Sequence, residues 1–171
     1  MERKEFPTYV FATVNHGRIP KVVEELKHKK DIDLVSPITG RYDLVVRLKP
    51  TERTEIYRAL QEIREIPDLR TTSTHTPFEG VQHVMKIEND TPICVSLLNV
   101  EHEPLEKAIE KLDKVPGLVE AFSVTGDFDI LALWQGKNTD EIMKNTVEKL
   151  DLFEDFSKTE TLIGRHPYFK P

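Results

Sequence analysis

The sequence predicts an α+β protein built from two tandem βαββαβ units whose sheets pack face to face. Three observations support this prediction. The chain has 171 residues, which is enough for two small domains. Its two halves align with each other in a nearly constant register. Within each half, short segments of β-forming residues alternate with segments in which apolar residues recur at helical spacing.

The internal repeat is the strongest of these observations. Gly40 aligns with Gly126 at an offset of 86, and the same offset pairs many identical residues. Those of the first half are Val14, His16, Lys21, Glu24, Leu26, Asp43, Glu55 and Ile56. One inserted residue then raises the offset to 87, which pairs Leu69 with Phe156. We therefore predict a tandem duplication, with a first domain at residues 1–80, a linker at 81–90 and a second domain at 91–171.

Both units have the same order of predicted elements. The first has strands at 8–14, 31–38, 42–49 and 69–77, with helices at 19–26 and near 55–63. The second has strands at 93–100, 117–124, 128–135 and 156–164, with helices at 105–112 and 142–150. This βαββαβ order is typical of the ferredoxin-like fold, in which both helices cover one face of an antiparallel sheet.

The face of each sheet without helices is also predicted to be buried, because the third strand carries large apolar residues on both faces. Packing of sheet on sheet buries it, either within one chain or between chains. Residues 1–80 contain 14 basic and 13 acidic residues, whereas residues 81–171 contain 10 and 17. This difference favours the pairing of unlike halves. The alternative is unrelated drift of solvated helix faces.

Composition excludes several classes of function. The formal net charge of −6 offers no broad basic surface for phosphates, which disfavours direct nucleic-acid binding. Cys94 is the only cysteine, so neither an intrachain disulfide nor a cysteine-pair zinc site is expected. The first residues do not read as a secretory signal, and the longest apolar run is too short to cross a bilayer. We expect a soluble, cytoplasmic protein.

The central hairpin of each unit carries the same motif, ITGRYDLVV at 38–46 and VTGDFDILA at 124–132. A glycine here allows a positive φ and the close approach of a ligand to the backbone. An aspartate just inside a strand needs a partner, because an unpaired buried carboxylate is costly. That partner is either a ligand or the N–H groups of the turn, in which case the motif only closes the hairpin.

A βαββαβ unit with the hairpin pattern [Ile/Val]-Thr-Gly-x-[Tyr/Phe]-Asp resembles the effector-binding domain of the Lrp/AsnC, or feast/famine, transcription regulators, known as the RAM domain. The resemblance covers nearly the whole chain, once per half. The helix-turn-helix of that family is not expected, since Tyr9 already lies in the first predicted strand. The chain is similar to a stand-alone, tandem form of the domain.

The resemblance implies a non-enzymatic module that senses a small effector, commonly an amino acid, in a cleft at an interface. The ligand-binding residues that it implies are Thr39, Gly40, Tyr42, Asp43, Thr125, Gly126, Asp127, Phe128 and Asp129. Arg41 stands where the second copy has Asp127, so the second hairpin is favoured as the amino-acid site. The first is expected to bind an acidic ligand or none. The resemblance also implies homo-oligomers and assembly with family members that carry a helix-turn-helix.

Two other functions compete with effector sensing. Imidazoles suit Cu(II) or Zn(II), and His16, His75, His83 and His102 are the candidate ligands, although no close histidine spacing supports them. Solvated or locally bonded histidines are the simpler interpretation. Small enzymes also use paired ferredoxin-like units, but no nucleophile has a matched base in the sequence, and Cys94 reads as a buried thiol. We therefore expect that the chain is not an enzyme.

Overall fold

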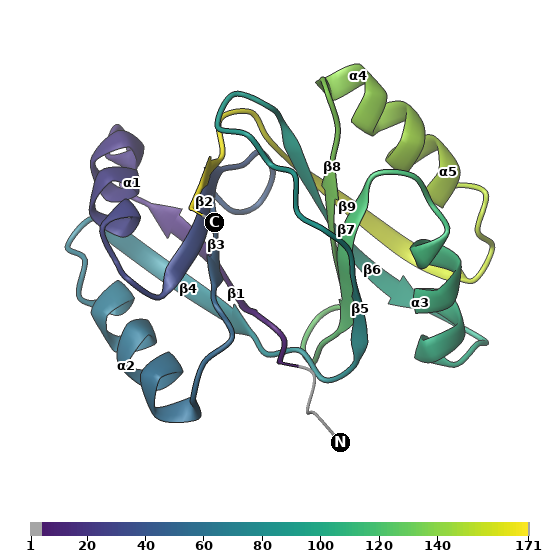
Figure 1. The fold of residues 1–171 in the computed structure, drawn as a ribbon, viewed down its shortest axis with the longest axis horizontal. Coiled ribbons are helices and arrows are strands. Elements are labelled where there is room, and N and C mark those ends of the chain that lie inside the picture. The colour runs from purple at the N-terminus through teal and green to yellow at the C-terminus, as the bar shows by residue number, and fades with distance from the viewer. Residues whose placement is uncertain (1–4, 171) are drawn as a thin grey trace.

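The computed structural model describes residues 5–170 and contains two five-stranded antiparallel sheets. Figure 1 shows the sheets facing each other, with the helices on the two outer sides. The first half contains β1 (Thr8–Val14), α1 (Ile19–Lys27), β2 (Ile32–Pro37), β3 (Leu44–Leu48), α2 (Arg53–Arg64) and β4 (Leu69–His75). No helix in the described part of the chain is long and apolar enough to cross a membrane.

The second half repeats this order, as predicted. It contains β6 (Ile93–Val100), α3 (Leu105–Asp113), β7 (Leu118–Ser123), β8 (Ile130–Gln135), α4 (Thr139–Ile142), α5 (Glu148–Leu150) and β9 (Phe156–Gly164). The strand registers also repeat, since β1 pairs Tyr9 with Arg47 on β3 and β6 pairs Val95 with Leu133 on β8. The predicted α+β fold of two βαββαβ units is confirmed.

The one-residue insertion in the second half takes the form of a π-helical turn at Met143–Val147, between α4 and α5. A π turn holds one extra residue without breaking the helix. The offset is 86 at Ile142, before this turn, and 87 at Leu150, after it. The insertion is therefore absorbed inside the helix, and the strands on either side keep their places.

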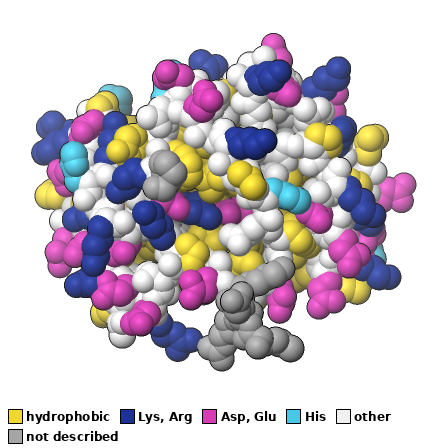
Figure 2. All heavy atoms as spheres, viewed as in Figure 1, with side chains coloured by type: hydrophobic (Ala, Val, Ile, Leu, Met, Phe, Trp, Pro, Cys, Tyr) yellow, Lys and Arg dark blue, Asp and Glu magenta, His cyan; other side chains and the backbone are white. Residues whose placement is uncertain are grey.

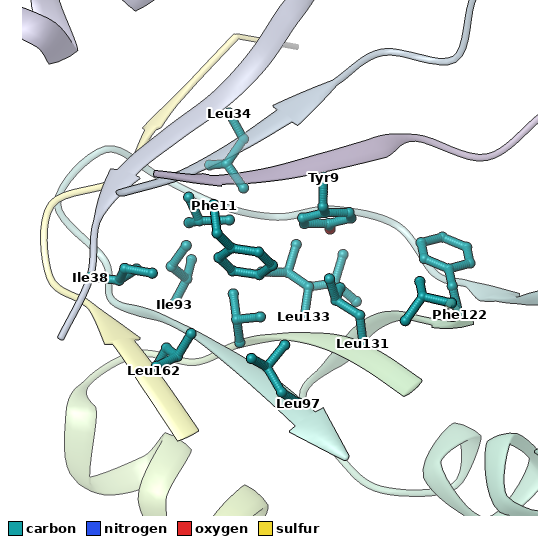
Figure 3. Close-up of a cluster of buried hydrophobic side chains, with 14 of the residues drawn as sticks. Tyr9, Phe11, Leu34, Ile38, Ile93, Leu97, Phe122, Leu131, Leu133 and Leu162 are labelled. Carbon is teal, nitrogen blue, oxygen red and sulfur yellow. The ribbon is translucent and has the colours of Figure 1, made fainter. Parts of the chain in front are cut away.

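The two sheets pack against each other within this one chain, which decides between the arrangements that the sequence left open. Figure 3 shows the inward side chains of both halves meeting in one cluster, with Tyr9 and Phe11 from β1 facing Leu131 and Leu133 from β8. All four are buried. Burial of apolar area at this interface stabilises the pairing of the halves. Charged side chains cover the helices, while hydrophobic ones reach the surface between the halves (Figure 2).

Each half also lends a strand to the sheet of the other. β5 (Gly80–Gln82) follows β4 in the chain but pairs with β7, and β10 (Tyr168–Phe169) follows β9 but pairs with β2. The two exchanged strands are equivalent at the offset of 87. Residues 81 and 82 of the predicted linker are thus part of the second sheet, and the predicted boundary at residue 80 cuts through β5.

Candidate functional site

The two Thr-Gly turns meet where the halves face each other. Gly40 and Gly126 both have positive φ angles, 110° and 117°, as glycines in these turns require. The residues that follow them form an ion pair, with Arg41 Nη1 3.7 Å from Asp127 Oδ2. Arg41 Nε also lies 3.1 Å from Glu160 Oε1 on β9. The sequence treated the turns as two separate sites, but the structure brings them together.

The aspartates of the motif have partners inside the chain. Asp43 Oδ2 accepts a hydrogen bond from the backbone N–H of Val14 at 2.8 Å, and Asp129 Oδ2 accepts one from Val100 at 3.0 Å. Each bond joins the hairpin to the end of the first strand of its own unit. The sequence offered two partners for each aspartate, a ligand or the backbone N–H groups of the turn. The observed partner is a backbone N–H group, although it belongs to the first strand and not to the turn. Ligand binding by these two residues stays a prediction.

The aromatic residues of the motif lie on the inter-repeat face. Tyr42 stacks on Phe11 at 5.1 Å between ring centroids, and Phe128 lies 4.7 Å from the imidazole of His75. The N–H of Thr39 donates to the carbonyl of Ile163 at 3.0 Å, so the first turn is bound to β9 of the other half. Burial lowers the pKa of the His75 imidazole, at the end of β4, and the backbone of Thr125 in the second turn offsets part of this effect. Each turn therefore contacts the last strand of the opposite unit.

A cleft of about 160 Å³ opens beside the two turns. It is lined by Arg41, Leu97, Asn99, Asp127, Phe128, Lys158 and Glu160. Asn99 faces Lys158, and Leu97 faces Glu160, across the β6–β9 ladder. Asn99 Oδ1 is buried and has no hydrogen-bond partner among residues 5–170. A buried amide oxygen without a donor is costly, so this atom is a candidate acceptor for a ligand.

The equivalent surface of the first half lacks this chemistry. Thr13 and Thr71 stand where the second half has Asn99 and Lys158, and their hydroxyl oxygens lie 2.5 Å apart in a mutual hydrogen bond. Ser73 replaces Glu160, and its hydroxyl lies 3.0 Å from His75 Nε2. These polar groups satisfy one another. The charged cleft is therefore a property of the second half, with Arg41 contributed by the first.

The candidate metal ligands do not gather. His16 and His102 are exposed in the turns after β1 and β6, and His83 Nε2 lies 2.5 Å from Asp113 Oδ1. His75 is buried at the interface, and burial lowers the pKa of its imidazole. In the described part of the chain, no three histidine, cysteine or acidic side chains come together as a metal site would require.

Cys94 is buried on β6, where burial raises the pKa of its thiol to about 12. The thiolate is the reactive form of cysteine. A thiol with this pKa in the apolar core between the sheet and its helices stays protonated at neutral pH. The interpretation of Cys94 as a packing residue is consistent with this position.

Two βαββαβ sheets packed face to face, with a polar cleft between their turns, define the class of protein: a dimeric α/β barrel in which both units belong to one chain. Residues 93–165 match the family model of the Lrp/AsnC ligand binding domain. The second repeat is therefore similar to the Lrp/AsnC ligand-binding domain, which confirms the resemblance seen in its hairpin motif. A comparison with curated protein sequences found no match.

Solved structures share the fold over nearly the whole chain. A siroheme decarboxylase, NirDL, matches 96% of this chain and 72% of its own, with a TM-score of 0.68 and 11% identity. A proposed monooxygenase from Fusobacterium nucleatum subsp. nucleatum matches 96% and 93%, with a TM-score of 0.58 and 9% identity. A major regulator of staphylococcal pathogenesis matches 94% and 99%, with a TM-score of 0.55 and 8% identity.

These neighbours correct one prediction. The sequence led us to expect that the chain is not an enzyme, because no catalytic set was visible in it. The neighbours include a decarboxylase and a proposed monooxygenase that share the fold over 96% of the chain. The expectation that the chain is not an enzyme was therefore wrong, since proteins with this architecture include enzymes as well as regulators.

Sequence reasoning missed Asn99, Lys158 and Glu160. The shared motif lies in the turns, whereas these three residues lie on strands, where the two copies differ. A signal was available in the repeat itself, because these are positions at which one copy is charged or carries an amide and the other has only hydroxyls. Differences between copies at cross-strand neighbours point to a site that only one copy has.

Proposed function

We propose that the cleft beside the Thr-Gly turns binds a small zwitterion of amino-acid type as an effector. The observation that carries this proposal is the buried Asn99 Oδ1, which has no donor in the described chain and lies across the ladder from Lys158. An α-ammonium group supplies the missing donor to Asn99. Lys158 supplies the charge that an α-carboxylate requires.

The remaining groups around the cleft fit the same ligand. Asp127 and Glu160, which pair with Arg41, add carboxylate oxygens to the lining, and Leu97 and Phe128 offer apolar surface to a side chain. The volume of about 160 Å³ is below the roughly 300 Å³ at which sites for drug-sized molecules begin. This supports an amino acid in preference to a porphyrin of the kind bound by the decarboxylase.

The test is a thermal-shift and calorimetric screen of the amino acids. A ligand at 100 times its Kd adds about 2.7 kcal/mol of stability, and each kcal/mol raises the Tm of a chain this size by about 2 to 4 °C. The variants Asn99→Thr and Lys158→Thr introduce the residues of the first half at these positions. They are expected to abolish the shift, whereas the exposed-lysine variant Lys144→Thr is expected to keep it.

The screen also separates sensing from catalysis. Mass spectrometry of each stabilising amino acid after incubation with the protein is expected to recover it unchanged, as an effector would be. Conversion of the ligand would make the cleft an active site. No shift with any amino acid, or a shift that both threonine variants retain, would contradict the proposal.

We also propose that the chain assembles with family members that carry a helix-turn-helix, an assembly that would link the effector cleft to transcription. Exposed edges support this, because β4 and β9 each end their sheet and Arg70, Thr71 and Lys158 on them are exposed. The test is size-exclusion chromatography of the chain mixed with a purified helix-turn-helix relative. Separate elution with and without the effector would count against assembly.

A further inference from the structure

A second polar site lies at the other end of β3 from the Thr-Gly turn. A depression of about 510 Å³ is lined there by Asp33, Arg47, Lys49, Met85, Phe169 and Lys170, together with Glu5 and Pro50. It combines apolar and charged side chains at the border between the halves, a mixture that Figure 2 shows on the surface of the molecule between them. The effector cleft has none of these residues.

Arg47 is the centre of a buried charge network beneath this depression. Its Nε and Nη2 donate to Glu120 of the other half at 2.9 and 3.0 Å, and its Nη1 donates to Asp33. The hydroxyl of Tyr9 donates to Glu120, and Gln82 Nε2 reaches the same carboxylate at 3.4 Å. Both oxygens of Glu120 are therefore occupied.

Asp33 is left incomplete by this network. Its Oδ2 accepts from Arg47, but Oδ1 is buried and has no hydrogen-bond partner within the described range. The side chain is 9% exposed. Burial raises the pKa of Asp33 to about 6, and Arg47 offsets only part of this effect. The carboxylate thus lacks one donor, and Asp33 is one of the residues that line the depression.

The second half shows that the fold does not need these polar residues. Val119, Leu133 and Gln135 occupy the positions equivalent to Asp33, Arg47 and Lys49, and Leu34 is the counterpart of Glu120. Val119, Leu133 and Leu34 are fully buried in the apolar core. Because apolar residues of similar size usually stabilise such positions at least as well as ion pairs, the polar set has another reason to be there.

The rim of the depression carries an excess of positive charge. Burial lowers the pKa of Lys170, and the nearby ammonium group of Lys49 lowers it further. The ammonium group of Lys170 donates to the carbonyls of Lys27 and Lys29 at 3.1 and 2.9 Å, which fixes its position. An anion between the two ammonium groups would relieve their repulsion.

We propose that this depression is a second ligand site, which binds an organic carboxylate that carries a hydroxyl or amino group and an apolar side chain. Lys49 and Lys170 hold the carboxylate, and the hydroxyl or amino group donates to Asp33 Oδ1. Met85 and Phe169 contact the apolar part. The site is independent of the effector cleft.

The probes for this site are phenyllactate and phenylpropionate, which differ only by the hydroxyl group. Binding is measured by calorimetry and by the NMR signal of the Met85 methyl group in the full chain. Phenyllactate is expected to shift that signal and to bind about tenfold more tightly than phenylpropionate, because a hydrogen bond to a charged group contributes about this factor.

The variants again take residues from the second half. Asp33→Val is expected to remove the preference for phenyllactate, and Asp33→Asn, whose amide oxygen accepts a hydrogen bond without the charge, is expected to reduce it if the valine variant does not fold. Lys49→Gln is expected to weaken both ligands at least tenfold. The exposed-lysine variant Lys144→Thr is the control and leaves both affinities unchanged. No shift of the Met85 signal at millimolar probe, or binding unchanged in Lys49→Gln, would overturn the proposal.

Discussion

His75 and Leu162 occupy equivalent positions on the last strands of the two repeats, and each lies beside the turn glycine of the other repeat. A Cβ atom at Gly40 would lie 2.5 Å from Leu162 Cδ2, and one at Gly126 would lie 3.8 Å from His75 Cε1. One interface is therefore closed by an aliphatic side chain and the other by an imidazole. This asymmetry makes the two turns respond differently to mutation and to pH.

His75 is expected to make stability depend on pH. Burial lowers the pKa of His75 below its ordinary value of 6.5, so the unfolded chain binds the proton more readily. The stability due to the neutral imidazole is complete above pH 6.5 and is lost as pH falls toward the folded-state pKa. His75→Leu introduces the residue of the other repeat. Its unfolding free energy relative to that of the wild type is expected to be more favourable at pH 5 than at pH 8, as measured by urea unfolding at the two pH values.

The control for this experiment is His28→Leu, because the His28 side chain is 81% exposed. It is expected to unfold with the pH dependence of the wild type. If His75→Leu also keeps that dependence, the imidazole is not the group that titrates.

The two turn glycines are expected to differ in their tolerance of alanine. Both φ angles are positive, which costs a non-glycine residue about 1 to 3 kcal/mol. Gly40→Ala additionally forces its methyl group into the side chain of Leu162, whereas the methyl group of Gly126→Ala makes an ordinary van der Waals contact with His75. The larger loss of unfolding free energy is expected for Gly40→Ala, and Leu162→Ala in the same chain is expected to recover part of it. Equal losses would show that the backbone angle alone decides.

Asp43→Ala and Asp129→Ala are expected to destabilise the chain equally, by about 1 to 3 kcal/mol, because each leaves a backbone N–H without its acceptor. Effector binding is expected to weaken more in Asp129→Ala, since its hairpin supplies Asp127 and Phe128 to the cleft. Calorimetry at a temperature where both variants are folded separates the two effects. Equal losses of affinity would remove the distinction between the hairpins.

Arg47→Leu is expected to cost about 3 to 5 kcal/mol, because it leaves Glu120 and Asp33 buried without their cation. Adding Asp33→Val and Glu120→Leu completes the apolar set of the other repeat. The triple variant is expected to recover most of the loss in urea unfolding. A triple variant as unstable as the single one would mean that the network is required for the halves to pair.

The fold could be predicted from the sequence because the duplication shows the pattern of each helix and main strand twice. A stripe such as Val22 and Leu26 has its counterpart at Ala108 and Leu112, so chance patterns are excluded. The strands β5 and β10 escaped prediction because three and two residues are too few to show an alternation. Their pairing partners lie in the other half of the chain, which no local pattern reveals.

The candidate site was predicted only in part, for a geometric reason. The sequence placed Arg41 and Asp127 in separate sites, since they belong to separate hairpins, and only the packing of the two halves puts them 3.7 Å apart. The burial of Asn99 Oδ1 likewise depends on neighbours that are remote in sequence. Residue types at a turn can be read from a sequence, whereas a cleft formed between two repeats requires their relative placement.

The exchange of β5 and β10 determines the order in which the two sheets can be completed during synthesis. The ribosome makes β2 long before Tyr168 and Phe169, so the edge of β2 on which β10 pairs has no neighbour while most of the second half is synthesised. Chains emerge at about 5 to 20 residues per second, so the first sheet waits several seconds for its fifth strand. During that interval the nascent chain offers an open edge to other chains, and the pairing of β10 is the event that closes it.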